Sequence, residues 1–304
     1  MKVLVTGGAG FIGSHIVNAF LAAGHSVAVV DDLSTGHREN VDPRAVFHHV
    51  DIRSADLDSV LAMEKPDIVS HQAARANVRE SMEKPLLYAD VNVLGSLNLL
   101  EICRKRGVKK IIYASTGGAV YGEPQYLPVD ENHPVNPLDP YGASKHHVEH
   151  YLHLYWLNYK LPYTVLRYPN VYGPRQDPFG EAGVVAIFAN KMLKGEGVTI
   201  FGSGEQERDF VYVGDIARAN VLSVDKGDGN VYNIGSGIGT SINTIAEELR
   251  QVTGYKLTPA HGPAKLGEVW KTYLKADKAR HELGWQPIVP LRDGLRLTVD
   301  SLRR

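Results

Sequence analysis

Short apolar runs alternate with longer stretches of helical periodicity through the first two-thirds of the chain. The apolar runs are rich in Val and Ile and are predicted strands, at residues 3–6, 26–30, 46–50, 68–71, 110–115 and 163–167. Amphipathic stretches such as 13–23 and 90–106 lie between most of them. Continuous apolar strands with helical crossovers indicate a parallel sheet buried on both faces. Because such crossovers are right-handed, we predict an α/β fold with a doubly wound, Rossmann-type parallel sheet.

The amino-acid composition of the chain changes after about Tyr172. Gly and Pro cluster in VYGPRQDPFGEAG and again in IFGSGEQER, and a helical run follows at 242–253. No polar linker or low-complexity tract separates the two parts. We therefore expect two closely packed domains. The first is a Rossmann domain at 1–172 with a returning segment near 210–235, and the second is a smaller α/β substrate domain at 173–304.

The charge balance and the cysteine count narrow the class of protein. With 33 basic and 34 acidic residues the net charge is −1, so neither nucleic acid nor an anionic membrane is expected as the main partner. No apolar run approaches the roughly 18 residues of a membrane span. The single cysteine, Cys103, excludes an internal disulfide and lies in an apolar-periodic helix, where we expect it to be buried. These features favour a cytoplasmic enzyme.

A glycine-rich turn, LVTGGAGFIGSH at residues 4–15, separates the first predicted strand from the first predicted helix. Gly7, Gly10 and Gly13 are spaced as G-x-x-G-x-x-G, and Gly8 begins the related G-x-G-x-x-G. Such glycines let backbone N–H groups approach a pyrophosphate at the positive end of a helix. Asp31, about 20 positions on, can accept hydrogen bonds from ribose hydroxyls and repel a 2′-phosphate. The pattern predicts NAD rather than NADP, and a purely structural turn is the alternative.

Two later strand ends are also expected to meet the cofactor. After the third strand, Asp51 and Ile52 would flank the adenine. After the fourth strand, His71 and the segment 72–74 would lie under the cofactor. Both inferences come from position alone, and an ordinary loop is the competing interpretation of each.

The segment YGASK places Tyr141 and Lys145 one helical turn apart, so the two side chains share a helix face. A free phenol with a pKa near ~10 is a poor base, but a nearby ammonium stabilises the phenolate. The pair predicts removal of a proton from a sugar hydroxyl while hydride leaves the same carbon. Lys145 can also hold the nicotinamide ribose. The alternative is an ordinary surface tyrosine and lysine.

Five motifs together, TGGAGFIGSH, DDLSTG, YASTGGAVYG, YGASK and LRYPNVYG, resemble the extended short-chain dehydrogenase/reductase family, and within it the UDP-glucose 4-epimerases. The resemblance runs nearly end to end, through RDFVYVGDIARA and the NIGSG turn. It implies reversible 4-epimerisation of UDP-glucose and UDP-galactose, in which hydride leaves sugar C4 for tightly held NAD and returns to the opposite face. It also implies a homodimer formed through helices 90–106 and 141–159, and no metal.

The same resemblance assigns roles to individual residues, with Tyr141 as the base, Lys145 as its ribose-binding partner, and Asn170 and Arg208 at the substrate diphosphate. The positions expected to contact NAD are Gly7, Gly10, Phe11, Ile12, Gly13, Asp31, Asp32, Leu33, Ser34, Thr35, Gly36, Asp51, Ile52, Gln72, Ala73, Ala74, Asn92, Ser115, Tyr141, Lys145 and Tyr168. The positions expected to contact the UDP-sugar are Arg75, Thr116, Tyr141, Asn170, Gly183, Val184, Ile200, Phe201, Gly202, Arg208, Lys265, Glu268 and Thr272.

The chain departs from the family pattern in two places. The family usually has a Ser or Thr four residues before the tyrosine of VYG, and Gly117 stands there in this chain. Either the neighbouring hydroxyl of Thr116 serves instead, which we predict, or the reaction relies on Tyr141 alone. The second departure is Lys265 in place of the usual arginine of an R-x-G-D/E motif, which keeps the charge but loses the bidentate guanidinium.

One position bears on the choice of sugar. Motif spacing around KLGEVWKTYLKADKA places Thr272 at the wall near the sugar C2 substituent, where a small residue is associated with N-acetylated sugars. We therefore expect secondary activity on UDP-GlcNAc. A slip of one residue would put Tyr273 there instead and would close the pocket.

Other interpretations of the chain remain open at this point. A uronate epimerase, a decarboxylase or a nucleotide-sugar 4,6-dehydratase would use the same fold, although dehydratases usually carry an Asp-Glu pair where Gly118 and Ala119 stand. A non-catalytic NAD-sensing module would be expected to lose Tyr141 or Lys145. His146 and His150 are one turn apart, but surface or interface histidines are the favoured interpretation over a metal pair.

Overall fold

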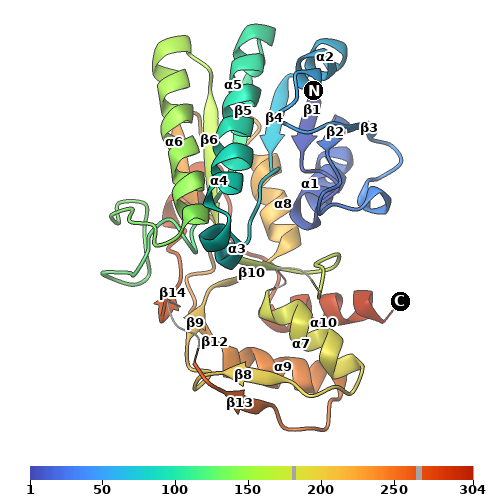
Figure 1. Cartoon of the computed structure of the whole chain (residues 1–304), viewed down its shortest axis with the longest axis vertical. Helices are drawn as coiled ribbons and strands as arrows, with labels where there is room; N and C mark the ends of the chain where they lie inside the picture. The colour runs from blue at the N-terminus through green and yellow to red at the C-terminus, as the bar shows by residue number, and fades with distance from the viewer. Residues whose placement is uncertain (180–182, 265–268, 304) are drawn as a thin grey trace.

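A seven-stranded parallel sheet forms the larger part of the molecule, as the computed structural model describes it for residues 1–179, 183–264 and 269–303 (Figure 1). From one edge to the other the strands are β11 (Asn230–Asn233), β6 (Tyr163–Tyr168), β5 (Lys110–Thr116), β4 (Ile68–His71), β1 (Lys2–Thr6), β2 (Ser26–Asp31) and β3 (Val46–His49). Every pairing in this sheet is parallel. The strand order reverses between β1 and β4, so the predicted doubly wound sheet is confirmed.

Helices cover both faces of the sheet, because its strands are apolar on both sides. On one face α1 (Phe11–Ala22) and α8 (Val213–Leu222) pack on a core that includes Ile16, Phe20 and Ile216. On the other face lie α2 (Asp56–Glu64), α5 (Gly95–Arg106) and α6 (Pro140–Tyr159), over a core that includes Leu99 and the predicted buried thiol of Cys103. The two layers leave the carboxyl ends of the strands open at one edge of the sheet.

Short helical segments lead into α5. They are α3 (Val78–Glu83), α4 (Pro85–Tyr88) and the π-helical turn η2 (Ala89–Leu94). The helix predicted at 90–106 is present, but its beginning is wound as a π-helix, a feature that is common near functional sites. Among the described residues, 85–106 is the one stretch long and apolar enough to span a membrane, and 44% of its apolar window is buried inside the protein. A single such helix is weak evidence for a membrane span, because partly buried helices of other proteins pass the same test.

The remainder of the chain gathers below the carboxyl ends of the strands (Figure 1). Helices α7 (Val184–Leu193), α9 (Ile242–Thr253) and α10 (Leu291–Leu302) share a core that includes Val185, Ile245 and Leu295. Small sheets flank them: β8 (Thr199–Phe201) with β13 (Ala260–Gly262), and β12 (Thr240–Ser241) with β9 (Glu207–Arg208) and β14 (Lys271–Thr272).

Two crossings connect the parts of the chain. Strand β7 (Asn170–Tyr172) pairs with β10 (Phe210–Tyr212), and β11 then returns to the edge of the large sheet. The division into domains at residue 172 stays a prediction.

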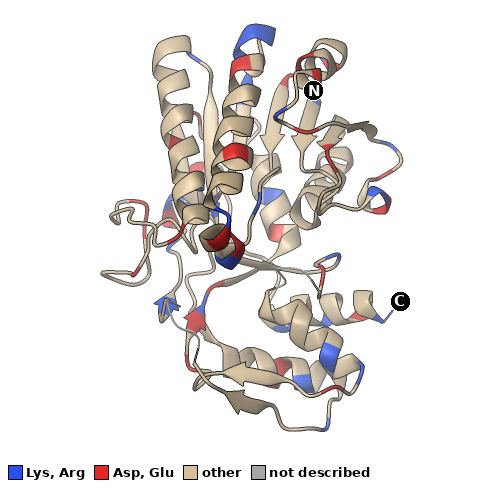
Figure 2. Ribbon diagram, viewed as in Figure 1, with Lys and Arg blue, Asp and Glu red and all other residues tan. Residues whose placement is uncertain are grey.

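Lys and Arg are interspersed with Asp and Glu over the ribbon, as Figure 2 shows. Two short helical turns, η1 (Arg38–Asn40) and η3 (Ala279–Leu283), complete the described elements.

Candidate active site

The glycine turn fits a phosphate. Gly7 has φ +69°, and a Cβ there would stand 2.6 Å from the backbone nitrogen of Ala73. A Cβ on Gly13 would collide with the carbonyl oxygen of Gly7. Gly10 caps α1 without a side-chain hydrogen bond, and the first turn, which begins with Phe11, carries no acidic residue. The helix therefore presents backbone donors and its positive end to the open edge of the sheet, which suits the pyrophosphate of NAD.

Asp31 ends β2 beside this turn. Its carboxylate oxygens accept hydrogen bonds from the backbone N–H of Ala9 and of Leu33, each at 2.9 Å. Burial raises the pKa of Asp31. A carboxylate has about four acceptor sites, so two remain for ribose hydroxyls. The residues after Asp31 form a turn in which Leu33 has φ +56° and the exposed Asp32 accepts from Ser34. Thr35 is exposed and Gly36 is half-buried beside Asp31.

The two residues expected at the adenine are engaged with the protein. Asp51 accepts hydrogen bonds from the Arg53 guanidinium, which lowers the pKa of Asp51. Ile52 is buried against Gly95 at the start of α5. Their contact with the cofactor stays a prediction.

A buried polar cluster lies under the ends of β4 and β6. The hydroxyl of Tyr168 donates to Gln72 Oε1 at 3.3 Å and accepts from Asn220 Nδ2 at 2.8 Å. Gln72 in turn donates to Ser70 at 3.0 Å. Two predicted cofactor residues, Gln72 and Tyr168, are thus brought together, and Asn220 of α8 is a partner that the sequence did not reveal. The cluster fixes the segment 72–74 at the carboxyl end of β4.

A chain of hydrogen bonds fixes His71 in one tautomer. Ser96 donates to the carbonyl oxygen of Asn92, so it accepts from His71 Nε2 at 2.8 Å. His71 Nδ1 then accepts from the Thr6 hydroxyl at 2.7 Å. Burial lowers the pKa of His71 to about 3, with a further contribution from the charge of Lys145. The ring is therefore neutral and acts as a spacer between β1, β4 and the η2 turn.

Asn92 ties the loop after β4 to α6. Its Oδ1 accepts from the backbone N–H of Arg75 at 2.8 Å, and its Nδ2 donates to the Arg75 carbonyl at 2.9 Å. The same amide donates to Ser144 at 2.9 Å. Asn92 was predicted to contact NAD, and the structure places it as a brace between Arg75 and the helix that carries Tyr141.

Tyr141 and Lys145 lie on the first turns of α6. Asp139 caps this helix by accepting from the Gly142 N–H at 2.7 Å, and Pro140 occupies the first position. Lys145 is buried, with its Nζ 4.5 Å from the centre of the Tyr113 ring. Burial lowers the pKa of Lys145 to about 7, although the charge of nearby Glu149 acts in the opposite direction. The cation–π contact holds the ammonium on the face of α6 that carries Tyr141.

Glu149 anchors a buried ionic network one turn further along α6. Its carboxylate accepts from Arg167 Nη2 and from Ser115 Oγ, each at 2.6 Å, and from His146 Nδ1 at 3.0 Å. Arg167 also donates to the Tyr121 hydroxyl at 2.8 Å. Ser115, a predicted cofactor contact, thus points to α6. The sequence analysis did not identify Glu149 and Arg167 as a buried pair. The available signals were a charged residue on an otherwise apolar face of the helix for Glu149, and a charged residue within the strand YTVLRY for Arg167.

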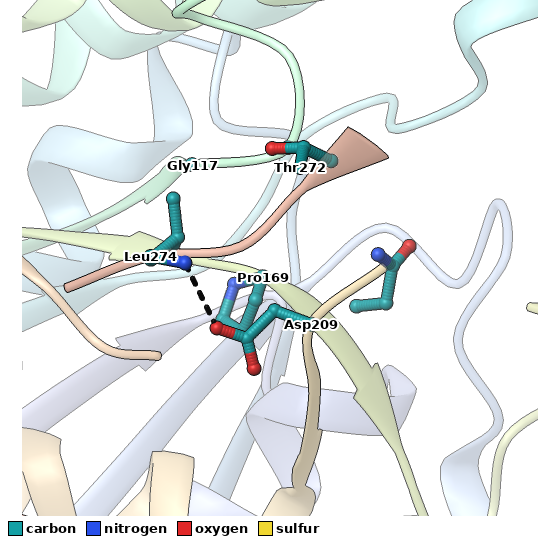
Figure 3. A pocket seen from close by; sticks show the side chains of 7 residues that line it. Gly117, Pro169, Asp209, Thr272 and Leu274 are labelled. Carbon is teal, nitrogen blue, oxygen red and sulfur yellow. Dashed lines mark hydrogen bonds between the residues drawn. The ribbon is translucent and has the colours of Figure 1, made fainter. Parts of the chain in front are cut away.

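Seven residues from four segments line a small hollow at the carboxyl end of β5 and β6. They are Gly117, Gly118, Pro169, Asn170, Asp209, Thr272 and Leu274 (Figure 3). Asn170 and Thr272 are predicted substrate contacts, and the structure brings them to one place. Thr116 is buried at the end of β5. Side chains alternate along a strand, so Thr116 lies on the face opposite Ser115. Gly117 and Gly118, directly after β5, line the hollow, and Thr116 is not among its lining residues.

Asp209 holds the far wall of this hollow. Its carboxylate accepts from the Leu274 N–H at 3.0 Å, from the Ser236 N–H at 3.0 Å and from the Ser236 hydroxyl at 2.6 Å. Burial raises the pKa of Asp209. The preceding residue, Arg208, pairs in register with Thr272, and its Nη1 donates to the Glu207 carbonyl at 2.9 Å. The pairing of β9 with β14 aligns Arg208 with Thr272, and the Asp209 carboxylate next to it fixes Leu274 and Ser236, which sequence patterns did not indicate.

The two residues weighed for the C2 wall face opposite ways. Thr272 is buried and lines the hollow. The Tyr273 ring instead packs over Gly239, where a Cβ would stand 2.8 Å from it. This alternation favours Thr272 as the wall residue.

The other predicted substrate positions are spread over the lower part of the chain. Gly183 caps α7 and Val184 begins it. Ile200 is buried in the core of the C-terminal helices, Phe201 is exposed, and Gly202 has φ +72°. Lys265 and Glu268 lie outside the described residues.

Residues 3–235 match the NAD dependent epimerase/dehydratase family. The chain belongs to this family. Among its relatives, the UDP-glucose 4-epimerase of Mycolicibacterium smegmatis is 42% identical over 309 residues, which cover 100% of this chain and 99% of that protein. The family match and this relative confirm the resemblance to UDP-glucose 4-epimerases that the sequence motifs indicated.

Solved structures of similar proteins cover this family member from end to end. The UDP-glucose 4-epimerase of Thermotoga maritima, determined with UDP-glucose, has a TM-score of 0.98 and 49% identity, over 100% of this chain and 99% of that one. The UDP-glucose 4-epimerase of Thermus thermophilus, in complex with NAD, has a TM-score of 0.94 and 47% identity, with the same coverage.

Proposed function

We propose that this chain is a UDP-glucose 4-epimerase that interconverts UDP-glucose and UDP-galactose with NAD as a permanently held cofactor. The observation that carries the proposal is the pairing of Tyr141 with a buried Lys145 on α6, at the open sheet edge that the glycine turn also faces. Relatives named for this activity cover the whole chain. Hydride removal and return at one carbon require both a redox cofactor and an acid–base group.

The chain's own residues supply the acid–base chemistry. Bound NAD would accept hydride from sugar C4 and return it. Tyr141 takes the proton of the C4 hydroxyl as a phenolate, which the neighbouring ammonium of Lys145 stabilises. The same tyrosine gives the proton back when the sugar is reduced. The Tyr113 ring keeps Lys145 from turning away.

The substrate diphosphate would be bound by residues of β7 and β9. Arg208 and Asn170 are the proposed partners, because a guanidinium donates to two phosphate oxygens at once. Their strands are joined through Asp209, whose carbonyl oxygen accepts from the Asn170 N–H at 3.0 Å. The role of Thr116 as a second hydroxyl stays a prediction, and a comparison of Thr116→Ala with Thr116→Ser tests it.

The decisive experiment is incubation of the NAD-loaded protein with UDP-galactose. UDP-glucose should form, identified by NMR, without net release of NADH. An unsaturated or decarboxylated product, or no product at all, would contradict the proposal. The dehydratase alternative is disfavoured because no acid stands at Gly118 or Ala119.

Cofactor preference gives a first prediction. The stripped protein should bind NAD at least about tenfold more tightly than NADP, because the Asp31 carboxylate would face the 2′-phosphate and like charges repel. Asp31→Ser should narrow this ratio, measured by calorimetric titration of both nucleotides. Asp32→Ser is the matched control, since that exposed carboxylate is one residue further on, and it should change the ratio less. Equal affinities in the wild type would refute the carboxylate argument.

Sugar size gives a second prediction. The wild type should turn over UDP-GlcNAc measurably but more slowly than UDP-galactose, because Thr272 is much smaller than the tyrosine associated with exclusion of N-acetylated sugars. Thr272→Tyr should lower the UDP-GlcNAc rate by about tenfold or more, since overpacking a wall is costly, while sparing UDP-galactose. Tyr273→Ala is the control, because its ring packs on Gly239 instead. No turnover of UDP-GlcNAc by the wild type would reject the assignment of Thr272.

We also propose that the protein is a cytoplasmic homodimer formed through the outer faces of α5 and α6. Leu154 and Leu157 of α6 are exposed, as is Leu94 at the end of η2 directly before α5, and α6 carries few charged residues on its visible face (Figure 2). Exposed leucines on adjoining helices are typical of helix–helix interfaces. A monomeric mass by light scattering would contradict the dimer.

A further inference from the structure

Leu274 occupies the space that any side chain at position 117 would need. A Cβ built on Gly117 collides with Leu274 Cδ1 and would stand 3.1 Å from Cδ2 and 3.2 Å from Cγ. Real Cβ atoms are very seldom so close to other heavy atoms, so Leu274 would have to rotate or shift. Figure 3 shows Leu274 beside the backbone of Gly117 in the hollow that Thr272 also lines.

Hydrogen bonds hold the backbones of both residues, so the contact can be relieved only by movement of the Leu274 side chain. The Gly117 N–H donates to the Tyr168 carbonyl at 2.7 Å. The Leu274 N–H donates to Asp209 at 3.0 Å, and backbone bonds on both sides of Leu274 join its strand to Val129. The Leu274 side chain is fully buried in a cluster that includes Val129 and Tyr121. The backbones are therefore fixed on both sides of the contact.

We propose that Leu274 is a positioning residue of the sugar site, whose side chain fills the space that a side chain at position 117 would need. This inference rests on the proposed function, because it takes the hollow as the sugar's surroundings. Leu274 supplies an apolar wall where the family usually presents a hydroxyl, in the hollow that Gly117 and Thr272 also line. Positions 117 and 274 are therefore coupled: a larger side chain at position 117 requires a smaller one at position 274.

A double-mutant cycle tests this coupling. Gly117→Ser alone should lower kcat/KM for UDP-galactose by at least about tenfold, because overpacking a buried contact is destabilising. Most of the loss should lie in KM, since the wall moves while Tyr141 and Lys145 stay in place. Gly117→Ser/Leu274→Ala should return to within about threefold of Leu274→Ala, the strong coupling expected of residues in contact. Gly117→Ala, which adds the Cβ without the hydroxyl, should show the same rescue.

Val129→Ala is the matched control for the cycle. Val129 belongs to the same cluster and forms an isolated β-bridge with Leu274, but the three atoms nearest to a Cβ at position 117 all belong to Leu274. Gly117→Ser/Val129→Ala should stay as impaired as Gly117→Ser. Additive effects of Gly117→Ser and Leu274→Ala, or rescue by Val129→Ala as well, would overturn the proposal.

The thermal midpoint of unfolding provides a second readout of the same cycle. The Gly117→Ser midpoint should fall and should partly recover in the double variant. If the wild type shows no epimerase activity, the proposed function fails, yet this coupling can still be measured. If the midpoints couple while the KM values do not, the contact is structural only and the positioning role is rejected.

Discussion

Tyr141→Phe should reduce turnover of UDP-galactose by on the order of 10²-fold or more while NAD remains bound. The substitution removes one oxygen and keeps the ring that packs at the start of α6. Without the phenol the group proposed to take the C4 proton is missing, and Lys145 can no longer act by stabilising its phenolate. Initial rates by product NMR and the nucleotide content of the purified variant are the two measurements.

Tyr113→Phe is the matched control for this result. Tyr113 is also beside Lys145, but its contribution is the ring face on which the ammonium lies. The hydroxyl that would be lost makes one long bond of 3.4 Å to the Lys145 carbonyl. This variant should lose far less turnover than Tyr141→Phe. Near-normal turnover of Tyr141→Phe would end the assignment of the base.

Glu149→Leu should destabilise the protein by about 3–5 kcal/mol, because it leaves the Arg167 guanidinium buried without its carboxylate. Both side chains are almost fully buried, and their two hydrogen bonds are 3.0 and 2.6 Å long. Urea unfolding followed by circular dichroism measures the loss. Glu149→Leu/Arg167→Met should recover much of it, since an apolar pair of similar volume leaves no isolated charge. A double variant no better than the single one would reject this explanation.

The same pair predicts an acid limit to stability. Burial opposes the charge of Glu149, but hydrogen bonds from Arg167, His146 and Ser115 prevail and lower its pKa from 4.5 to about 2. A carboxyl with a depressed folded-state pKa stabilises the protein above its unfolded pKa. That contribution should disappear as the pH falls from 4.5 towards 2. Glu149→Leu/Arg167→Met should show a weaker dependence on pH in this range.

Local patterns predicted the elements that depend on neighbouring residues. The strand at 68–71 and the helix at 242–253 have the predicted bounds, because apolar runs and helical periodicity are properties of short segments. The Tyr141–Lys145 pair was also visible, since one helical turn separates the two residues. The glycine turn could be predicted for the same reason.

Contacts between distant segments were not visible in the sequence. Glu149 meets Arg167 only because α6 packs on β6, and Asp209 meets Leu274 only because two small strands join. Gly117 and Leu274 are separated by about half of the chain, so their contact forms only when both parts of the chain have folded. Periodicity carries no information on such pairings, so Gly117 could be read only as a missing hydroxyl.

The return of β11 to the edge of the large sheet has a consequence for how the chain is made. Until residue 233 has left the ribosome, β6 is an open edge strand with unpaired backbone groups, although the rest of its sheet can already form. A nascent or truncated chain that stops near residue 172 would expose this edge to other chains. We expect such fragments to aggregate, and we expect folding to finish only after most of the second half has been synthesised.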